Sequence, residues 1–171
     1  MSNVEKFLIR CGFDHIMSNL LEILIGSVKG KAYKSKQMIV VRKDLKMRKG
    51  KIAAQAGHAC VTAVLLALEK ENRLGDIKSL EGHIILNSSD KPSTPLSEWF
   101  DYGVAKICVS IDSEEALLEI DKKAKEAGII SALILDAGHT EFNGVPTYTC
   151  LALEPESAEK VDPITGDLPL Y

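Results

Sequence analysis

Short runs of apolar, mostly β-branched residues alternate with longer helical patterns over most of this 171-residue sequence. The runs are five to eight residues long, which is typical of buried strands, and they occupy residues 37–41, 104–111, 129–136 and 147–153. Strands that alternate with helices predict an α/β fold, here a three-layer sandwich with a mixed, roughly four-stranded sheet flanked by helices. About ten residues join the last two strands, too few for a helical crossover, so these strands are expected to pair antiparallel.

Helix signals accompany these strands. One helix is expected at about 50–70, and a second follows the strand at 104–111. Asp112 or Ser113 caps this second helix, acidic residues fill its first turn, and Gly128 ends it. A brief final helix is expected to stop before Pro163, because proline interrupts a helix interior.

Two regions stand apart from this alternation. Residues 1–36 are predicted to form an N-terminal helical extension (an amphipathic pattern at 4–28) and a basic linker, preceding a domain at 37–171. We expect the extension to dock on the domain or on a partner, with a membrane-surface or organelle-targeting helix as the alternative. The second region is an insert at about 72–103, where "HIILN" suggests a short strand and "PLSEWFDY" a short helix.

The helix at 50–70 carries a polar strip on an otherwise apolar surface. Lys51, Gln55, His58 and Thr62 follow the spacing of one helical face, and nearly every other residue from Ile52 to Leu68 is apolar. We therefore expect this helix to be buried around most of its circumference. The simpler interpretation is that the strip only faces solvent, and that His58 is a hydrogen-bonded structural residue.

Charge is distributed unevenly along the chain. The net charge is −3, yet residues 1–51 hold 12 basic and 4 acidic residues. Six of the cations surround the start of the helix at 50–70, where the helix dipole disfavours positive charge; they are Arg42, Lys43, Lys46, Arg48, Lys49 and Lys51. The segment lacks the glycine and the hydroxyl residue of a phosphate-binding P-loop, so an RNA backbone is a more suitable anion than a nucleotide.

A second polar group follows the strand at 129–136. Asp136 ends that strand, where ligands of open α/β sheets bind, and Thr140 follows within one turn. A local turn stabilised by these side chains is the alternative. The four cysteines and four histidines show no metal-ligand spacing, and the separated cysteines are typical of a reducing compartment. We therefore expect a cytoplasmic protein without a metal or other cofactor, and organelle or membrane association through residues 1–36 stays open.

Three motifs together carry a resemblance. "VVRKDLKMRKGKIAAQAGHA", "DAGHT" and "DPITGDLPLY" resemble the archaeal and eukaryotic, or second, type of peptidyl-tRNA hydrolase. The resemblance runs from about Gln37 to Tyr171, and the insert diverges from it. It implies hydrolysis of the ester between a peptide and its tRNA, without a metal. Homodimers are frequent in this family, and no feature of the sequence fixes the oligomeric state.

The resemblance also implies residue roles. Lys51, Asp136 and Thr140 match the family's catalytic residues, and Gln55 and His58 match further positions of its helix motif. Asp136 would orient or deprotonate a water molecule, and Lys51 would keep Asp136 ionised or stabilise the oxyanion. Thr140 would donate a hydrogen bond to the substrate, and Gln55 would fix the lysine or the water. His58 is expected to support these groups from behind.

The substrate-binding residues follow from the basic cluster. We expect the tRNA to be gripped by Arg42, Lys43, Lys46, Arg48, Lys49 and His139. Two of these depart from the family pattern, which usually has Gly at 48 and Arg at 139, so the cation could have moved from 139 to 48. With Arg48, the loop must adopt a helical or extended backbone there. A non-catalytic interaction or RNA-binding protein that retains the fold is the alternative function.

Overall fold

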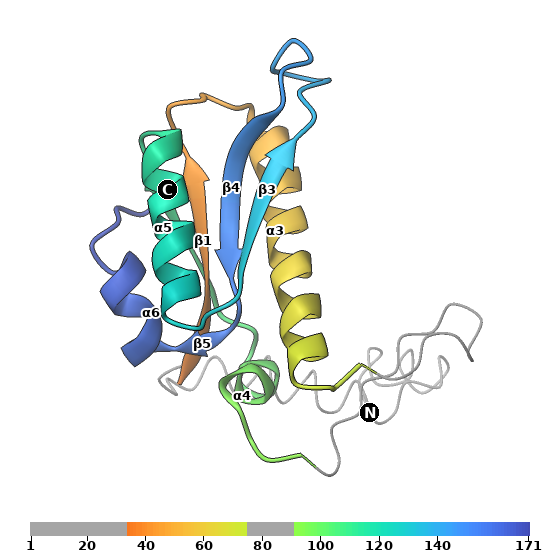
Figure 1. The fold of residues 1–171 in the computed structure, drawn as a ribbon, viewed down its shortest axis with the longest axis vertical. Helices are drawn as coiled ribbons and strands as arrows, with labels where there is room; N and C mark the ends of the chain where they lie inside the picture. The colour runs from red at the N-terminus through yellow and green to blue at the C-terminus, as the bar shows by residue number, and fades with distance from the viewer. Residues whose placement is uncertain (1–33, 75–90) are drawn as a thin grey trace, which may run out of the picture.

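The computed structural model describes residues 34–74 and 91–171, and Figure 1 shows their arrangement. Its elements follow the predicted alternation of strands and helices. They are β1 (Ser35–Arg42), α3 (Lys49–Lys70), α4 (Pro95–Asp101), β2 (Lys106–Ile111), α5 (Glu114–Glu126), β3 (Ser131–Asp136), β4 (Thr147–Leu153), β5 (Glu156–Ser157) and α6 (Ala158–Thr165).

The sheet is mixed, as the sequence predicted. Its strands lie in the order β2-β1-β4-β3, and the short β5 pairs with the start of β1. β1 and β2 run parallel, whereas β4 runs antiparallel to both β1 and β3. The α/β sandwich expected from the sequence is therefore confirmed, and the antiparallel β3–β4 pair brings the end of β3 beside the start of β4.

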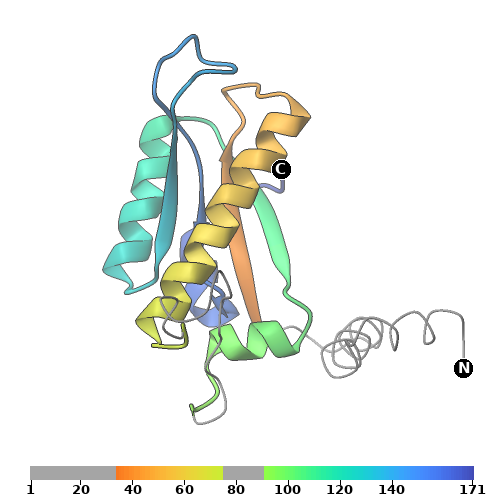
Figure 2. The ribbon, with the colours of Figure 1, turned by 90° about the vertical axis from the view of Figure 1, so that its right-hand side faces the viewer.

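Helices cover both faces of the sheet (Figure 2). Alternation along β1 divides its side chains between two cores, because successive residues of a strand point to opposite faces. Met38 and Val40 pack with the residues of α5 and α6, whereas Ile39 and Val41 pack with the residues of α3. The α3 core holds small residues such as Ala59 and Ala63, so the helix can lie close to the sheet.

The polar strip of α3 faces partly inward, so the simpler interpretation that it only faces solvent does not hold. Gln55 is buried and Lys51 is half-buried, whereas His58 is exposed. Apolar residues elsewhere on the helix are not fully covered, and Val61 has 60% of its surface exposed. The expectation that α3 is buried around most of its circumference is wrong for the residues that the structure describes. Lys51 and Gln55 hydrogen-bond with polar groups of β3 and β4, so this side of the helix faces the sheet.

The other helix boundaries show where sequence signals held and where packing decided. Ser113 caps α5 by accepting a hydrogen bond from the backbone N–H of Ala116, and Gly128 follows the helix with a φ of +72°. The prediction that the last helix stops before Pro163 is wrong, because α6 continues to Thr165. Its buried face, with Val161 and Thr165, keeps the helical backbone despite the missing proline N–H.

Residues of the insert are described only in part. The short helix expected in "PLSEWFDY" is α4, and Thr94 caps it in a reciprocal arrangement with Ser97. Buried Leu96 of α4 packs against the end of α3, which ties the helix to the domain. The predicted strand "HIILN" and the helix expected at 4–28 lie outside the described residues.

Candidate active site

The first turns of α3 place two polar side chains on the face toward the sheet. Lys51 and Gln55 are four residues apart, so they lie one turn above the other. Arg48 precedes the helix with φ −62° and ψ 149°, the extended backbone that the loss of glycine at this position required. No acidic residue lies in the first turn of α3, so the positive end of the helix is left for a more distant carboxylate.

Asp136 supplies that carboxylate from the last position of β3. The chain turns sharply after it, and Gly138 takes a φ of +81°. A Cβ atom at this position would lie 2.4 Å from the backbone oxygen of Val145, so only glycine fits. The N–H of Gly138 donates to Asp136 Oδ1 at 2.9 Å, which holds the carboxylate in one orientation.

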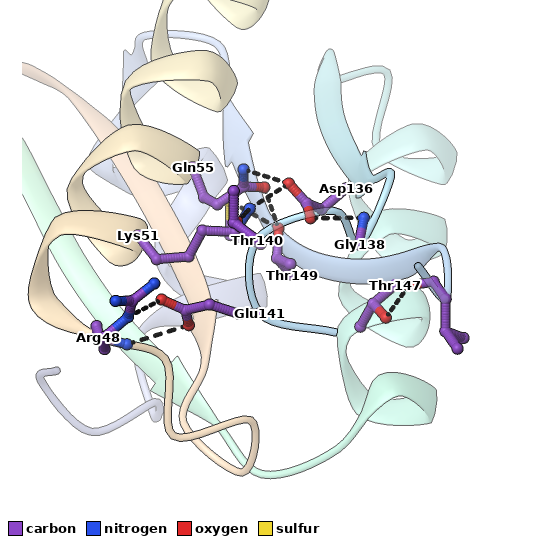
Figure 3. Close-up of polar contacts among 11 residues, drawn as sticks. Arg48, Lys51, Gln55, Asp136, Gly138, Thr140, Glu141, Thr147 and Thr149 are labelled. Atoms are coloured by element: carbon purple, nitrogen blue, oxygen red, sulfur yellow. Dashed lines mark hydrogen bonds and ion pairs between the residues drawn. The ribbon is translucent and has the colours of Figure 1, made fainter. Parts of the chain in front are cut away.

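The two elements meet at the Asp136 carboxylate (Figure 3). Lys51 Nζ donates to Asp136 Oδ2 at 2.5 Å, and the same ammonium group donates to Thr140 Oγ1 at 3.1 Å. Gln55 Nε2 donates to Asp136 Oδ2 at 2.9 Å. Lys51 and Asp136 side chains are 12% and 13% exposed, so both groups are shielded yet open to a small molecule. The structure thus brings together four residues that the sequence spreads over 90 positions.

Thr149 of β4 completes this network and was not predicted from the sequence. Its hydroxyl donates to Gln55 Oε1 at 2.6 Å, and the residue is fully buried. Because the carbonyl oxygen of Gln55 is occupied in this way, its amide nitrogen must face the carboxylate of Asp136. The sequence offered no signal for Thr149, since a threonine in an alternating strand is common.

The surroundings of Asp136 favour its charged form. The hydrogen bond from Lys51 lowers the pKa of the Asp136 carboxyl group below its ordinary value, and the bonds from Gly138 and Gln55 act in the same direction. The aspartate is therefore ionised at neutral pH. An ionised carboxylate with a lowered pKa is a weak base, so its main contribution here is to accept hydrogen bonds in fixed directions.

The basic cluster around the start of α3 is largely compensated by acidic residues. Arg42 is only 8% exposed, and its guanidinium group donates to Asp44, to Glu114 and to the backbone oxygen of Tyr148. The predicted contact between Arg42 and tRNA does not fit this position, because the residue joins β1 to its neighbours. The hydrogen bond to the Asp44 carboxylate raises the pKa of Arg42 further.

The other cations of the cluster remain at the surface. Lys43 lies 3.2 Å from Asp112 in an exposed ion pair, which contributes little energy and can be exchanged. Lys46 and Lys49 are exposed and have no ion pair with any described residue. Lys46 adopts a left-handed backbone with a φ of 49°, which turns the loop between β1 and α3.

Arg48 has a carboxylate partner that the sequence did not reveal. Its Nε donates to Glu141 Oε1 at 2.6 Å, and its backbone N–H donates to Glu141 Oε2 at 3.3 Å (Figure 3). The hydrogen bond from Arg48 lowers the pKa of Glu141. The Arg48 side chain is 77% exposed and that of Glu141 is 13% exposed, so the glutamate is shielded and the arginine lies at the surface.

A pocket of about 540 Å³ opens over these groups. Residues from α3 and from the segment after β3 line it; they are Arg48, Gly50, Lys51, Ala54, Gln55, His58, Asp136, Thr140 and Glu141. His58 is exposed and lines the pocket, so it does not support the network from behind as expected. His139 is exposed but is not part of the lining. Within residues 34–74 and 91–171, no group of three or more His, Cys, Asp or Glu side chains is placed to hold a metal ion.

The fold and the pocket together define an α/β protein with a polar, charge-paired site at the end of a strand, where enzymes of this class bind their substrates. Residues 35–171 match the family described as peptidyl-tRNA hydrolase PTH2. The chain is 44% identical over 135 residues to "Peptidyl-tRNA hydrolase" of Methanothermobacter thermautotrophicus, covering 79% of this chain and 98% of that protein. This chain therefore belongs to the PTH2 peptidyl-tRNA hydrolase family.

Two further relatives show the breadth of the similarity. "Peptidyl-tRNA hydrolase" of Methanopyrus kandleri is 39% identical over 135 residues, which cover 79% of this chain and 97% of that protein. "Probable peptidyl-tRNA hydrolase 2" of Dictyostelium discoideum is 38% identical over 136 residues, which cover 80% of this chain and 54% of that protein. The resemblance read from the sequence motifs is thereby confirmed.

Proposed function

We propose that this pocket hydrolyses the ester bond between the peptide and the terminal ribose of peptidyl-tRNA. The observation that carries the proposal is the shared contact of Lys51, Gln55 and Gly138 with the Asp136 carboxylate. A scaffold or a binding protein has no chemical need for a shielded carboxylate that is held by three donors. Membership of the hydrolase family supports the same reaction, and disfavours the non-catalytic alternative.

The lone pairs of Asp136 indicate where water binds. Each carboxylate oxygen has about two acceptor positions. Oδ2 accepts from both Lys51 and Gln55, so its positions are filled. Oδ1 accepts only from Gly138 among the described residues, which leaves one position for a water molecule. We therefore assign Oδ1 as the acceptor that orients the attacking water.

The donors of Lys51 indicate where the ester carbonyl lies. An ammonium group has three N–H donors, and two of them are directed to Asp136 and Thr140. The third is available for the ester oxygen, on which negative charge develops during attack. Because Thr140 Oγ1 accepts from Lys51, its own hydrogen is free to donate to the same substrate.

The reaction then needs no covalent bond between the substrate and the enzyme. The water oxygen attacks the ester carbonyl carbon, and the carbonyl π electrons move to the oxygen that Lys51 faces. Collapse of this intermediate breaks the bond to the ribose oxygen and releases the peptide as a carboxylic acid, which ionises. The proton lost by the water passes to the ribose oxygen, which leaves as a hydroxyl group. The lowered pKa of Asp136 favours orientation of the water over its deprotonation in this scheme.

The tRNA contacts are assigned to the exposed part of the basic cluster. Lys46 and Lys49 are the first candidates, because no described carboxylate pairs with them. Lys43 and Arg48 can exchange their carboxylates for phosphates, since both ammonium and guanidinium groups are exposed. His139 is retained as a proposed contact because it is exposed. Arg42 is excluded from this set by its burial.

The cellular setting remains part of the proposal. Cys60, Cys108 and Cys150 are free thiols, and burial raises the pKa of the Cys150 thiol to about 12. Such thiols fit a reducing compartment, and we place the hydrolase domain at 37–171 in the cytoplasm.

The test is a single-turnover deacylation assay with the purified full chain and N-blocked aminoacyl-tRNA at low salt. We expect hydrolysis by the natural sequence and a loss of at least 100-fold in Lys51→Ala, the size seen when a donor to an oxyanion is removed. Lys122→Ala is the matched control, because Lys122 is an exposed lysine on α5, away from the pocket. Binding of tRNA without deacylation would instead identify an RNA-binding protein.

A further inference from the structure

The outward face of α3 is apolar, although it is not covered by any described element. Val61, Leu65 and Leu66 expose 60%, 38% and 40% of their surfaces. The most apolar 18-residue window of α3 would suffice in length and composition to cross a membrane, yet only 28% of it is buried. A helix at the surface of a soluble domain normally carries charged residues on this side.

This face forms one continuous strip. Ala54, Gly57, Val61 and Leu65 succeed each other at intervals of three or four residues, so they lie along one side of the helix. All four are exposed. The small residues at its start allow close approach of a second helix, and the larger ones at its end offer area to bury. We call the second part of this face, Val61 and Leu65 with the neighbouring Leu66, the α3 strip, because Ala54 belongs to the pocket lining.

The helix α5, on the other face of the sheet, is an ordinary amphipathic surface helix and serves as a comparison. Its buried side holds Leu117, Ile120 and Ala124, while lysines and glutamates form exposed pairs on its outer side. No such pairs occur on the outer side of α3 within the described residues. The difference indicates that something of apolar character covers α3.

The sequence preceding the described domain has the matching pattern. Leu21, Leu24, Ile25 and Val28 have the i, i+3, i+4, i+7 spacing of an apolar helical stripe. A helix over 4–28 would be roughly 37 Å long, against roughly 33 Å for α3, at 1.5 Å per residue. A helix of that length is more than sufficient to cover the second half of α3.

The point of entry of the chain also fits. Gln37 Nε2, near the start of β1, donates to the backbone oxygen of Cys60 at 3.1 Å, so β1 begins beside the second half of α3. Residues 29–34 can span up to about 20 Å when extended. This length exceeds the roughly 10 Å diameter of a helix, so the preceding segment can reach the outer side of α3 around Leu65.

We propose that residues 4–28 of the same chain dock on the α3 strip, with the stripe of Leu21, Leu24, Ile25 and Val28 facing Val61 and Leu65. The stripe at 21–28 covers the second half of α3, whereas the pocket wall at Ala54 and His58 lies in the first half of the helix. Hydrolysis does not depend on this contact, so the proposal and the catalytic assignment can fail separately.

Photo-crosslinking of the full chain tests the contact directly. A benzophenone amino acid replaces Leu65, and Leu118 of α5, 36% exposed, is the matched control position. We expect an adduct at monomer mass whose peptide maps to residues 4–28, and none there from position 118. An adduct at twice the monomer mass would show a second copy on the strip and overturn the proposal. Crosslinks to residues 75–90 or to added lipid vesicles, or none above the control, would overturn it as well.

A charge-introducing variant provides a second readout. Val61→Asp with Leu65→Asp should raise the rate of protease cleavage within residues 1–33 by about tenfold, because a charged strip no longer protects them. Deacylation should stay within twofold of the natural sequence, and Leu118→Asp should leave both rates unchanged. Unchanged cleavage in a double variant with native circular dichroism would contradict the docking.

Discussion

Two lysine–aspartate pairs of nearly equal length lie on opposite faces of the sheet, and only one of them forms a site. Lys51 Nζ lies 2.5 Å from Asp136 Oδ2, and Lys125 Nζ lies 2.6 Å from Asp121 Oδ2. Lys125 and Asp121 are one turn apart on α5, and the lysine is 61% exposed. Lys51 and Asp136 come from different elements, and both side chains are less than 15% exposed.

The comparison shows that distance alone does not make a reactive pair. The pair on α5 is local, and a pair of this kind contributes about 0.3–0.5 kcal/mol to a helix. The pair in the pocket has additional partners in Gln55, Thr140 and Gly138, which fix the direction of each donor and acceptor. Donors and acceptors with fixed directions, shielded from bulk solvent, are what an ester hydrolysis site requires.

The helices that carry the two lysines, α3 and α5, also differ. α5 has a serine cap, two glutamates in its first turn and lysines in its last turn, each of which stabilises a helix. α3 has no side-chain cap and no acidic residue in its first turn, and Lys51 lies there instead. The ends of α5 thus carry residues that stabilise a helix, whereas the start of α3 carries cations that can bind anions.

The largest expected effect comes from replacing the aspartate of each pair by asparagine in two separate variants. Asp136→Asn should lower kcat/KM for deacylation by at least 100-fold, because the amide presents a donor where an acceptor is needed. Asp121→Asn should change kcat/KM by less than twofold. Single-turnover kinetics measure both, and similar losses in the two variants would contradict the distinction between the pairs.

The second largest effect is expected from the Thr149 hydroxyl, which donates to Gln55. Thr149→Val removes the hydroxyl that orients the Gln55 amide and leaves its oxygen buried without a partner. We expect kcat to fall about tenfold and the free energy of unfolding to drop by about 1–3 kcal/mol. Thr149→Ser should restore most of kcat. Equal kcat in the valine and serine variants would remove Thr149 from the positioning network.

The exposed lysines should affect binding more than chemistry. In the Lys46→Ala, Lys49→Ala double variant we expect KM to rise several-fold with kcat retained. The logarithm of the tRNA binding constant falls linearly with the logarithm of the salt concentration. The slope of this line should become shallower by somewhat less than one for each phosphate that the two lysines no longer neutralise. Lys122→Ala with Lys123→Ala on α5 is the control. An unchanged salt slope would place the tRNA elsewhere.

The cap of α5 should affect stability alone. Ser113→Ala removes the hydroxyl that accepts from the Ala116 N–H, so the free energy of unfolding should fall by about 1 kcal/mol. Chemical denaturation measures this change, and deacylation should not differ from that of the natural sequence. A loss of activity at constant fraction folded would show that α5 takes part in the site.

The pH dependence should show the smallest effect. The pKa of Asp136 is lower in the folded than in the unfolded chain, so its contribution to stability is present above the unfolded value and is lost as the pH falls through the folded value. Asp136 should stay ionised from pH 8 to 5, so we expect the deacylation rate to show no loss from its protonation in this range. The ion pair with Lys51 should break only below the ordinary aspartate pKa of 3.8. The His58→Gln, His139→Gln background isolates this carboxylate. An acid limb near pH 6 there would contradict the role as an orienting acceptor.

The sequence by itself determined the order of the elements, the mixed sheet and the family. Periodicity located β4 at 147–153 without error, and the motifs around Lys51 and Asp136 identified the two sides of the pocket. These features are encoded by residues close in sequence, through side-chain alternation and turn chemistry.

Only the tertiary structure decided the partners of each charge. Arg42 and Lys49 look alike in the sequence, yet one is buried between two carboxylates and the other is exposed without a described ion pair. Thr149 became part of the site because β4 lies beside α3, and Glu141 because its loop returns over Arg48. Such pairings depend on packing between segments about 90 residues apart, and no local pattern of hydrophobic and polar residues specifies them.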